Sequence, residues 1–190
     1  MIPSFDLSGV LPPYVGPDPT VPATLSPYDA TIVEFIDRFA TSGPRRSILM
    51  GLLKYRQALN DLGVLAGFQW LSGSFLEDIE KLEGRAPRDL DIVTFMRRPQ
   101  AVSSDPAWLK FVLENLPIFD PAQVKATHGC HAFPVDLSLA AEGVVPQTSY
   151  WFGLLSHRRV TLQWKGFVRV PLFDGQDIVA LDHLSQASRT

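Results

Sequence analysis

The chain of 190 residues contains a single cysteine, Cys130. One thiol cannot form a disulfide within the chain, which excludes the small disulfide-stapled extracellular domains and favours a reducing compartment. No stretch reaches the roughly 20 apolar residues that a membrane-spanning helix needs. The start, Met1-Ile2-Pro3-Ser4-Phe5-Asp6, lacks the charged residues and the apolar run of a signal peptide. We therefore expect a cytoplasmic protein without a membrane partner.

An excess of basic residues is also lacking. The chain carries 17 Lys and Arg against 20 Asp and Glu, for a formal net charge of −3. This balance excludes the basic stripe of a dedicated nucleic-acid binder, although a local basic cluster stays open. With 46% hydrophobic residues the chain can bury a sizeable core. The length suits one domain.

Proline is abundant only at the start. Residues 1–27 contain seven prolines, which excludes a regular helix or a central strand there. Its apolar side chains, such as Phe5 and Leu11, predict an extended arm that wraps the surface of a single domain at 28–190. The alternative is that Leu11-Pro12-Pro13-Tyr14 binds a partner.

The remaining sequence predicts an α+β domain with a small mixed β-sheet flanked by helices. Ser26 and Pro27 resemble the start of a helix, and Trp108, Leu109, Val112, Leu113 and Leu116 are expected to face inward from a later one. Strands are expected at 68–71, 90–95 and 135–139, and a hairpin at 160–164 and 167–170. The helices are expected at about 27–39, 45–62, 106–116 and 177–184, with a polar loop at 76–88. The apolar segment 150–155 is expected to be a helix or part of one.

The most informative residues are Gly73-Ser74 and Asp89-Leu90-Asp91. Because residues i and i+2 of a strand point to one face, Asp89 and Asp91 aim two carboxylates at one place. Mg²⁺ binds such oxygens together with substrate phosphates, so we expect Mg²⁺ or Mn²⁺ here. Gly73 allows a tight turn, and the turn N–H groups and the Ser74 hydroxyl can donate to phosphates. The alternatives are a solvated strand end and an ordinary Gly-Ser turn.

A third acid, Asp136, interrupts the apolar segment Phe133-Pro134-Val135-Asp136-Leu137. If this strand lies beside that of Asp91, three carboxylates converge, and Asp136 completes a metal site or removes a proton from an acceptor hydroxyl. The alternative for Asp136 is a carboxylate that caps a turn or pairs with an arginine. Arg85 and Arg88, just before Asp89, could neutralise phosphate charge.

Together, Gly73-Ser74, Asp89-x-Asp91 and a strand Asp136 resemble the nucleotidyltransferase superfamily of the DNA polymerase beta type. Within it the chain resembles a group of uncharacterised minimal bacterial and phage proteins, also in Leu11-Pro12-Pro13 and Tyr150-Trp151-Phe152-Gly153. The resemblance implies a nucleotidyltransferase-like fold, Asp89, Asp91 and Asp136 as catalytic and metal-binding residues, and a nucleoside triphosphate held by Gly73, Ser74, Arg85 and Arg88.

Other clusters carry weaker interpretations. His128-Gly129-Cys130-His131 does not have the spacing of a standard zinc site and is expected in a turn. Because this turn leads into the strand of Asp136, it stays open that either histidine lies near the active site. The basic groups at Arg45-Arg46 and Lys54 are expected on a solvated face, with contact to nucleotide or nucleic acid as the alternative. The group His157-Arg158-Arg159, with Lys165, is a candidate contact for nucleotide or acceptor.

The functional hypothesis is metal-dependent transfer of a nucleoside monophosphate from a triphosphate to an acceptor hydroxyl. A protein side chain, an RNA end or a second nucleotide stays open as acceptor, in a toxin–antitoxin or antiphage system. The competing hypothesis is a non-catalytic antitoxin or nucleotide-binding regulator that binds a protein from a neighbouring gene. A third is a structural protein that merely retains the fold.

Overall fold

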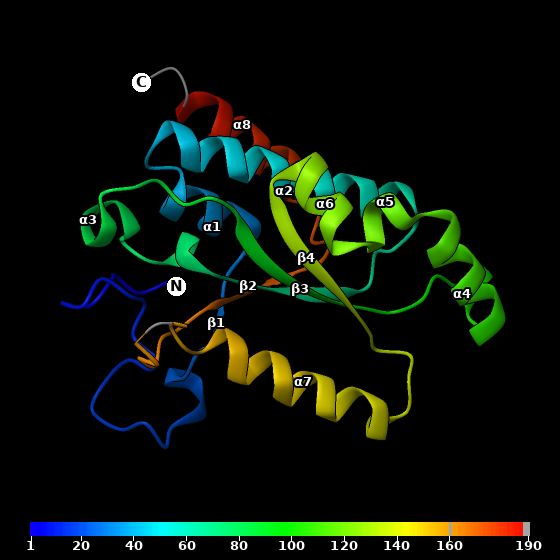
Figure 1. Cartoon of the computed structure of the whole chain (residues 1–190), viewed down its shortest axis with the longest axis horizontal. Helices are drawn as coiled ribbons and strands as arrows, with labels where there is room; N and C mark the ends of the chain where they lie inside the picture. The colour runs from blue at the N-terminus through cyan, green and yellow to red at the C-terminus, as the bar shows by residue number, and fades with distance from the viewer. Residues whose placement is uncertain (160, 188–190) are drawn as a thin grey trace.

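A five-stranded mixed sheet flanked by helices forms the protein, which confirms the expected α+β class (Figure 1). The computed structural model describes residues 1–159 and 161–187. The strands are β1 (Tyr28–Asp29), β2 (Gly67–Ser72), β3 (Leu90–Met96), β4 (Cys130–Asp136) and β5 (Val168–Pro171). Their order across the sheet is β1-β5-β2-β3-β4. Strand β2 runs antiparallel to both neighbours, whereas β3 and β4 run parallel.

Most helices cover one face of the sheet, on the upper side of Figure 1. They are α1 (Ile32–Phe39), α2 (Gly43–Asp61), α5 (Leu116–Phe119), α6 (Pro121–His128) and α8 (Asp177–Ala187). Helix α1 begins later than the sequence predicts, because Tyr28 and Asp29 pair with β5 instead. Thr31 then caps the helix, in a reciprocal capping box with Glu34.

The opposite face of the sheet carries α7 (Ala141–Leu155), which contains the segment 150–155 that was expected to be a helix or part of one. Trp70 of β2 packs on this side against Phe152 of α7, with ring centroids 6.3 Å apart. Helix α4 (Asp105–Glu114) lies at the end of the molecule. The expected inward face of this helix is partly wrong, since Leu109 and Leu113 are more than half exposed and Leu116 is 38% exposed. No helix within the described residues is long and apolar enough to cross a membrane.

Three local predictions need correction. The expected loop at 76–88 contains the short helix α3 (Ile79–Glu83), whose Ile79 is fully buried. The second half of the expected hairpin is β5, but its first half is absent from the described part of 160–164, where Trp164 forms only an isolated bridge with His157. Residue 160 lies outside the described residues. The third correction concerns β4, which begins at Cys130, five residues before the expected start at 135, after an unexpected helix α6.

The N-terminal arm lies against the domain. Val10 and Leu11 are fully buried, and Val10 forms a bridge with Glu77. The carbonyl of Leu11 accepts a hydrogen bond of 2.7 Å from the N–H of Gly166, just before β5. The arm contains one short 3₁₀ helix, η1 (Pro22–Thr24); two more, η2 (Ser74–Leu76) and η3 (Gln100–Val102), follow β2 and β3. The arm therefore covers the segments on which the Gly73 turn and β5 rest.

Candidate functional site

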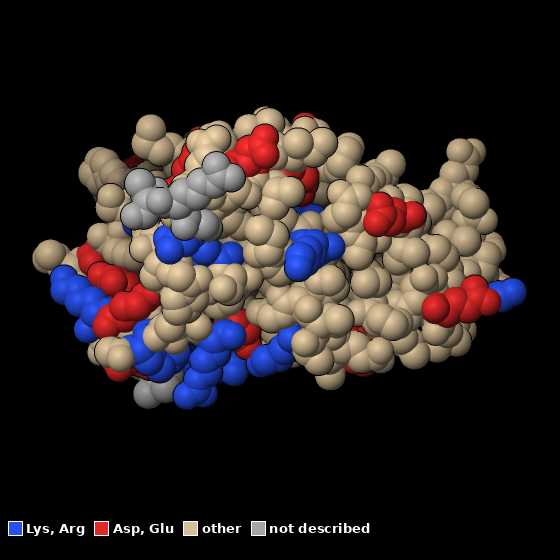
Figure 2. All heavy atoms as spheres, turned by 90° about the horizontal axis from the view of Figure 1, so that it is seen from above, with Lys and Arg blue, Asp and Glu red and all other residues tan. Residues whose placement is uncertain are grey.

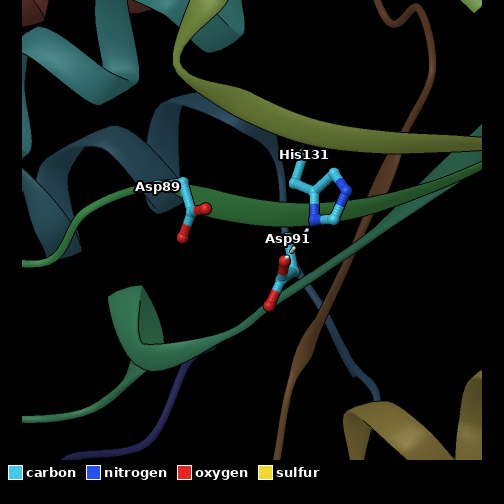
Figure 3. A group of neighbouring side chains, drawn as sticks. All are labelled: Asp89, Asp91 and His131. Carbon is cyan, nitrogen blue, oxygen red and sulfur yellow. Dashed lines mark ion pairs between the residues drawn. The ribbon is translucent and has the colours of Figure 1, made fainter. Parts of the chain in front are cut away.

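Asp89, Asp91 and His131 converge at one end of the β3–β4 pair (Figure 3). Asp91 lies opposite His131 in the parallel register, and Asp89 immediately precedes β3. One ligand atom from each of the three side chains lies within 4.8 Å of the other two. All three are partly buried, and the Nδ1 atom of His131 lies 3.5 Å from Oδ1 of Asp91. Two carboxylates and one imidazole therefore present a set of metal-ligand atoms to a single point.

Asp136 is not part of this group, so the expected convergence of three carboxylates does not occur. In the parallel register Asp136 lies opposite Met96, five residues along β4 from His131 and on the order of 16 Å away along the strand. Its Oδ2 accepts a 2.6 Å hydrogen bond from Nε of Arg98. This is the arginine pairing that the sequence left as the alternative. The error came from the start of β4, because a strand beginning at Cys130 puts His131 where the third acid was expected.

Gly73 brings the turn after β2 directly against Asp91. Its φ of +85° and ψ of −170° belong to a region that side chains other than glycine rarely adopt. A Cβ atom at this position would lie 2.7 Å from Oδ2 of Asp91. The next residue, Ser74, begins η2, and its hydroxyl forms no hydrogen bond with any described residue. The turn and the carboxylate thus meet as the sequence predicts.

A buried lysine, Lys165, holds this turn in place. The Nζ atom of Lys165 donates to the carbonyl of Gly73 at 2.9 Å and to Oε1 of Glu77 at 2.6 Å. Both charged side chains are about 95% buried, and Nε of Arg158 donates to the other oxygen of Glu77 at 3.0 Å. Burial lowers the pKa of Lys165, while the charge of Glu77 opposes that shift. Lys165 also lies close enough to Asp91 for its positive charge to lower the pKa of that carboxyl.

A buried arginine holds the other side of the same segment. Arg45 of α2 is 3% exposed and donates from Nη1 to the carbonyl of Phe75 and from Nη2 to that of Glu77, both at 2.7 Å. Its Nε and Nη2 also bind both carboxylate oxygens of Glu80 in α3. This arginine was expected on a solvated face. Its burial is explained by the five N–H donors of the guanidinium group, which bind the backbone carbonyls and the carboxylate of the neighbouring irregular segment.

We expect Arg45→Met to lower the free energy of unfolding by about 3 kcal/mol, because two carbonyls and a carboxylate lose a charged donor. Urea denaturation would measure the change. Arg46→Met is the matched control, since Arg46 donates one 3.3 Å hydrogen bond to Ala40. We expect it to cost less than about 1 kcal/mol. Equal effects of the two variants would contradict the anchoring role of Arg45.

The Arg45–Glu80 pair also predicts a dependence of stability on pH. The hydrogen bond from Arg45 lowers the pKa of Glu80 from its ordinary value of 4.5. The contribution of this carboxylate to stability is therefore complete above pH 4.5 and is lost as the pH falls through the lowered pKa. Unfolding curves at several pH values should show a smaller acid loss for Arg45→Met than for the wild type. A parallel acid loss in both proteins would show that the pair does not supply this dependence.

Opposing influences act on the ionisation of Asp91. Burial raises the pKa of Asp91, and the nearby charge of Asp89 adds to this shift. Arg159, His131 and Lys165 act in the opposite direction. On the far side, Nζ of Lys125 in α6 lies 2.5 Å from Oδ2 of Asp89, with its side chain half exposed. Two acids held together against their electrostatic preference are typical of functional sites.

The predicted phosphate ligands Arg85 and Arg88 are not brought into this group. Arg85 pairs with Glu83 and donates to the carbonyl of Ala86. Arg88 is exposed and forms no ion pair with any described residue. Instead, the basic segment after α7 lines a surface hollow of about 550 Å³, whose walls include His157, Arg158 and Arg159. In the view from above, most Lys and Arg side chains lie over one half of the molecule, mixed with acidic ones (Figure 2).

Sequence reasoning left open that His131 lies near the active site but did not assign it to the metal group, and it missed Lys125. The signal for His131 was the alternation of Cys130, His131, Ala132 and Phe133, in which the odd positions share a face. Cys130 points the other way, with its thiol toward the carbonyl of Ile48 in α2. Cys130 is therefore not among the grouped side chains, and burial raises the pKa of its thiol to about 12. Lys125 left no signal, because α6 was not expected.

Comparison with known proteins identifies one relationship. A family model described as a family of unknown function (DUF6932) matches residues 3–171, which is most of the chain. No curated protein matches. No solved structure matches either.

Proposed function

We propose that this chain, which belongs to the family of unknown function DUF6932, is a metal-dependent nucleotidyltransferase. In the proposed reaction an acceptor hydroxyl oxygen bonds to the α-phosphorus of a nucleoside triphosphate. The bond from that phosphorus to the β-bridging oxygen breaks, pyrophosphate leaves, and the hydroxyl proton passes to solvent. The observation that carries the proposal is the contact between the Gly73 turn and the Asp89–Asp91–His131 group.

The residues fit a divalent metal ion. Two carboxylates and an imidazole with ligand atoms within 4.8 Å of one another form a usual donor set. A divalent ion bound there would supply positive charge to the triphosphate and to the charge that develops during transfer. Asp89 and Asp91 would hold it by oxygen and His131 by nitrogen. Lys125, half exposed, can release Asp89 to the ion.

The phosphates have donors beside this group. The N–H groups after Gly73 and the Ser74 hydroxyl can donate to phosphate oxygens, as they do in other glycine turns that bind anions. Lys165 keeps the turn in place and adds positive charge close to Asp91. Exposed Arg159, which lines the hollow and whose charge acts on Asp91, can contact the rest of the substrate or the acceptor. Chemistry of this kind depends on positioning and charge neutralisation more than on covalent groups.

One observation favours the second candidate, a nucleotide-binding regulator that does not turn substrate over. Among the described residues, no third carboxylate lies with Asp89 and Asp91, because Asp136 is bound to Arg98. Asp136 therefore cannot serve as the proton acceptor that the sequence assigned to it. A regulator of this kind would bind metal and nucleotide and act through a protein partner, such as the product of a neighbouring gene.

Label transfer separates the two candidates. The purified protein is incubated with each α-labelled ribonucleoside triphosphate and Mg²⁺ or Mn²⁺, with and without cellular RNA and protein. A labelled product that disappears in Asp89→Ala/Asp91→Ala but persists in Asp136→Asn supports the transferase, and its size names the acceptor as nucleotide, RNA or protein. Metal-dependent binding without product supports the regulator. Absence of nucleotide binding contradicts both.

A further inference from the structure

His131 is the unexpected member of the site, an imidazole beside two carboxylates. Its position follows from the parallel register, which sets His131 opposite Asp91 on the same face of the sheet. Its ring packs against Phe133, two residues along the strand, with centroids 4.4 Å apart. The ring is therefore supported from one side, and Nδ1 is turned toward Asp91 (Figure 3).

The third side chain of the group is therefore a nitrogen ligand and not a third carboxylate. Among the described residues, the Asp, Glu, His and Cys side chains grouped at this point are Asp89, Asp91 and His131. Mg²⁺ is a hard ion that takes oxygen ligands and keeps several of its waters. Imidazole nitrogen instead favours first-row transition-metal ions, whose affinity for nitrogen ligands exceeds that of Mg²⁺.

We propose that the resident ion is a first-row transition-metal ion of the Mn²⁺ to Zn²⁺ series, with His131 as its nitrogen ligand, rather than Mg²⁺. This inference rests on the proposed metal site of the transferase and specifies its ion. Lys125 does not oppose it, since a half-exposed ammonium on a flexible stem can move to solvent when a divalent ion takes its place at Asp89.

The test measures metal affinity directly, without nucleotide and without activity. Free Mn²⁺ is followed by electron paramagnetic resonance, and Mg²⁺ is added as competitor. The wild type is compared with His131→Asp, which makes the side-chain set all oxygen, and with His131→Ala. His183→Ala is the matched control, because Nδ1 of His183 pairs with Asp37 at 2.8 Å outside the site. Thermal melts establish that each variant is folded.

We expect His131→Ala to weaken Mn²⁺ binding about tenfold or more, and His183→Ala to leave it unchanged. The ratio of Mn²⁺ to Mg²⁺ affinity should fall at least about tenfold in His131→Asp. This ratio is the decisive quantity, because an added negative charge strengthens the binding of both ions. An unchanged ratio, or Mn²⁺ binding that does not depend on His131, would overturn the inference.

The two proposals fail separately. If Mn²⁺ binds through His131 but no label is transferred, the choice of ion stands and the transferase does not. If label transfer depends on Asp91 but the ion preference is the same in His131→Asp, the transferase stands and the role of His131 is wrong.

Discussion

Replacing Asp91 by asparagine is expected to abolish metal-dependent nucleotide binding while leaving the fold at least as stable as the wild type. The carboxylate faces Asp89 and His131, so its loss removes one of two anionic ligands, and nucleotide affinity in the presence of Mn²⁺ should fall at least about 100-fold. Burial and the charge of Asp89 raise the pKa of Asp91, which shows that its charged form is disfavoured in the fold. An amide of the same shape removes that cost.

Asp136→Asn is the matched control for this prediction, because it should change stability but not nucleotide binding. Asp136 is bound to Arg98, so its replacement should lower the free energy of unfolding by about 1–2 kcal/mol and leave nucleotide binding unchanged. Isothermal titration with a nucleoside triphosphate and Mn²⁺, together with denaturation curves, measures both quantities for both variants. Normal binding by Asp91→Asn, or lost binding by a folded Asp136→Asn, would contradict the placement of the site.

Gly73→Ala is expected to damage both stability and metal binding. A Cβ atom would lie 2.7 Å from Oδ2 of Asp91, so this carboxylate or the turn must shift from its present position beside Asp89 and His131. The φ of +85° adds backbone strain of about 1–3 kcal/mol for any side chain. We therefore expect a loss of stability of about 3 kcal/mol and Mn²⁺ affinity at least about tenfold weaker.

Gly84→Ala separates the two effects. Gly84 also has a positive φ, of +63°, but a Cβ there would meet no atom within 4 Å. Its replacement should cost about 1 kcal/mol and leave the metal affinity unchanged. Titration of Mn²⁺ and urea denaturation distinguish the outcomes. If Gly73→Ala behaves like Gly84→Ala in both measurements, the close approach of the turn to Asp91 has no functional importance.

The fold could be predicted where one periodicity dominates. Helix α2 and strand β3 follow their hydrophobic patterns closely, within a few residues of the expected ends. For α4 the helix itself was predicted, but part of its expected inward face was wrong, because Leu109 and Leu113 face solvent. The prediction failed at Ser26-Pro27, where the residues typical of a helix start precede a two-residue strand. In both cases the result depends on which other element packs or pairs with the segment, and the local sequence pattern does not contain that information.

The candidate site shows the same limit more sharply. Asp89, Asp91, Gly73 and Ser74 lie where their short-range pattern predicts, since they follow from one strand and one turn. Asp136 and His131 depend on where β4 begins and on its register with β3, which no single strand reveals. The buried ion pair of Lys165 and Glu77 likewise joins residues 88 positions apart. A charged residue in an apolar strand thus indicates a partner but not which partner.

The central claim is that Asp89, Asp91 and His131 together bind a divalent ion that holds a nucleotide at the Gly73 turn. Diffraction from crystals soaked in Mn²⁺ and a non-hydrolysable nucleoside triphosphate, recorded for the anomalous signal of manganese, tests it most directly. The account predicts an anomalous peak at bonding distance from all three side chains, with phosphate density against Gly73 and Ser74. A peak at Asp136 or elsewhere, or crystals that hold the nucleotide with no peak beside Asp91, would contradict it.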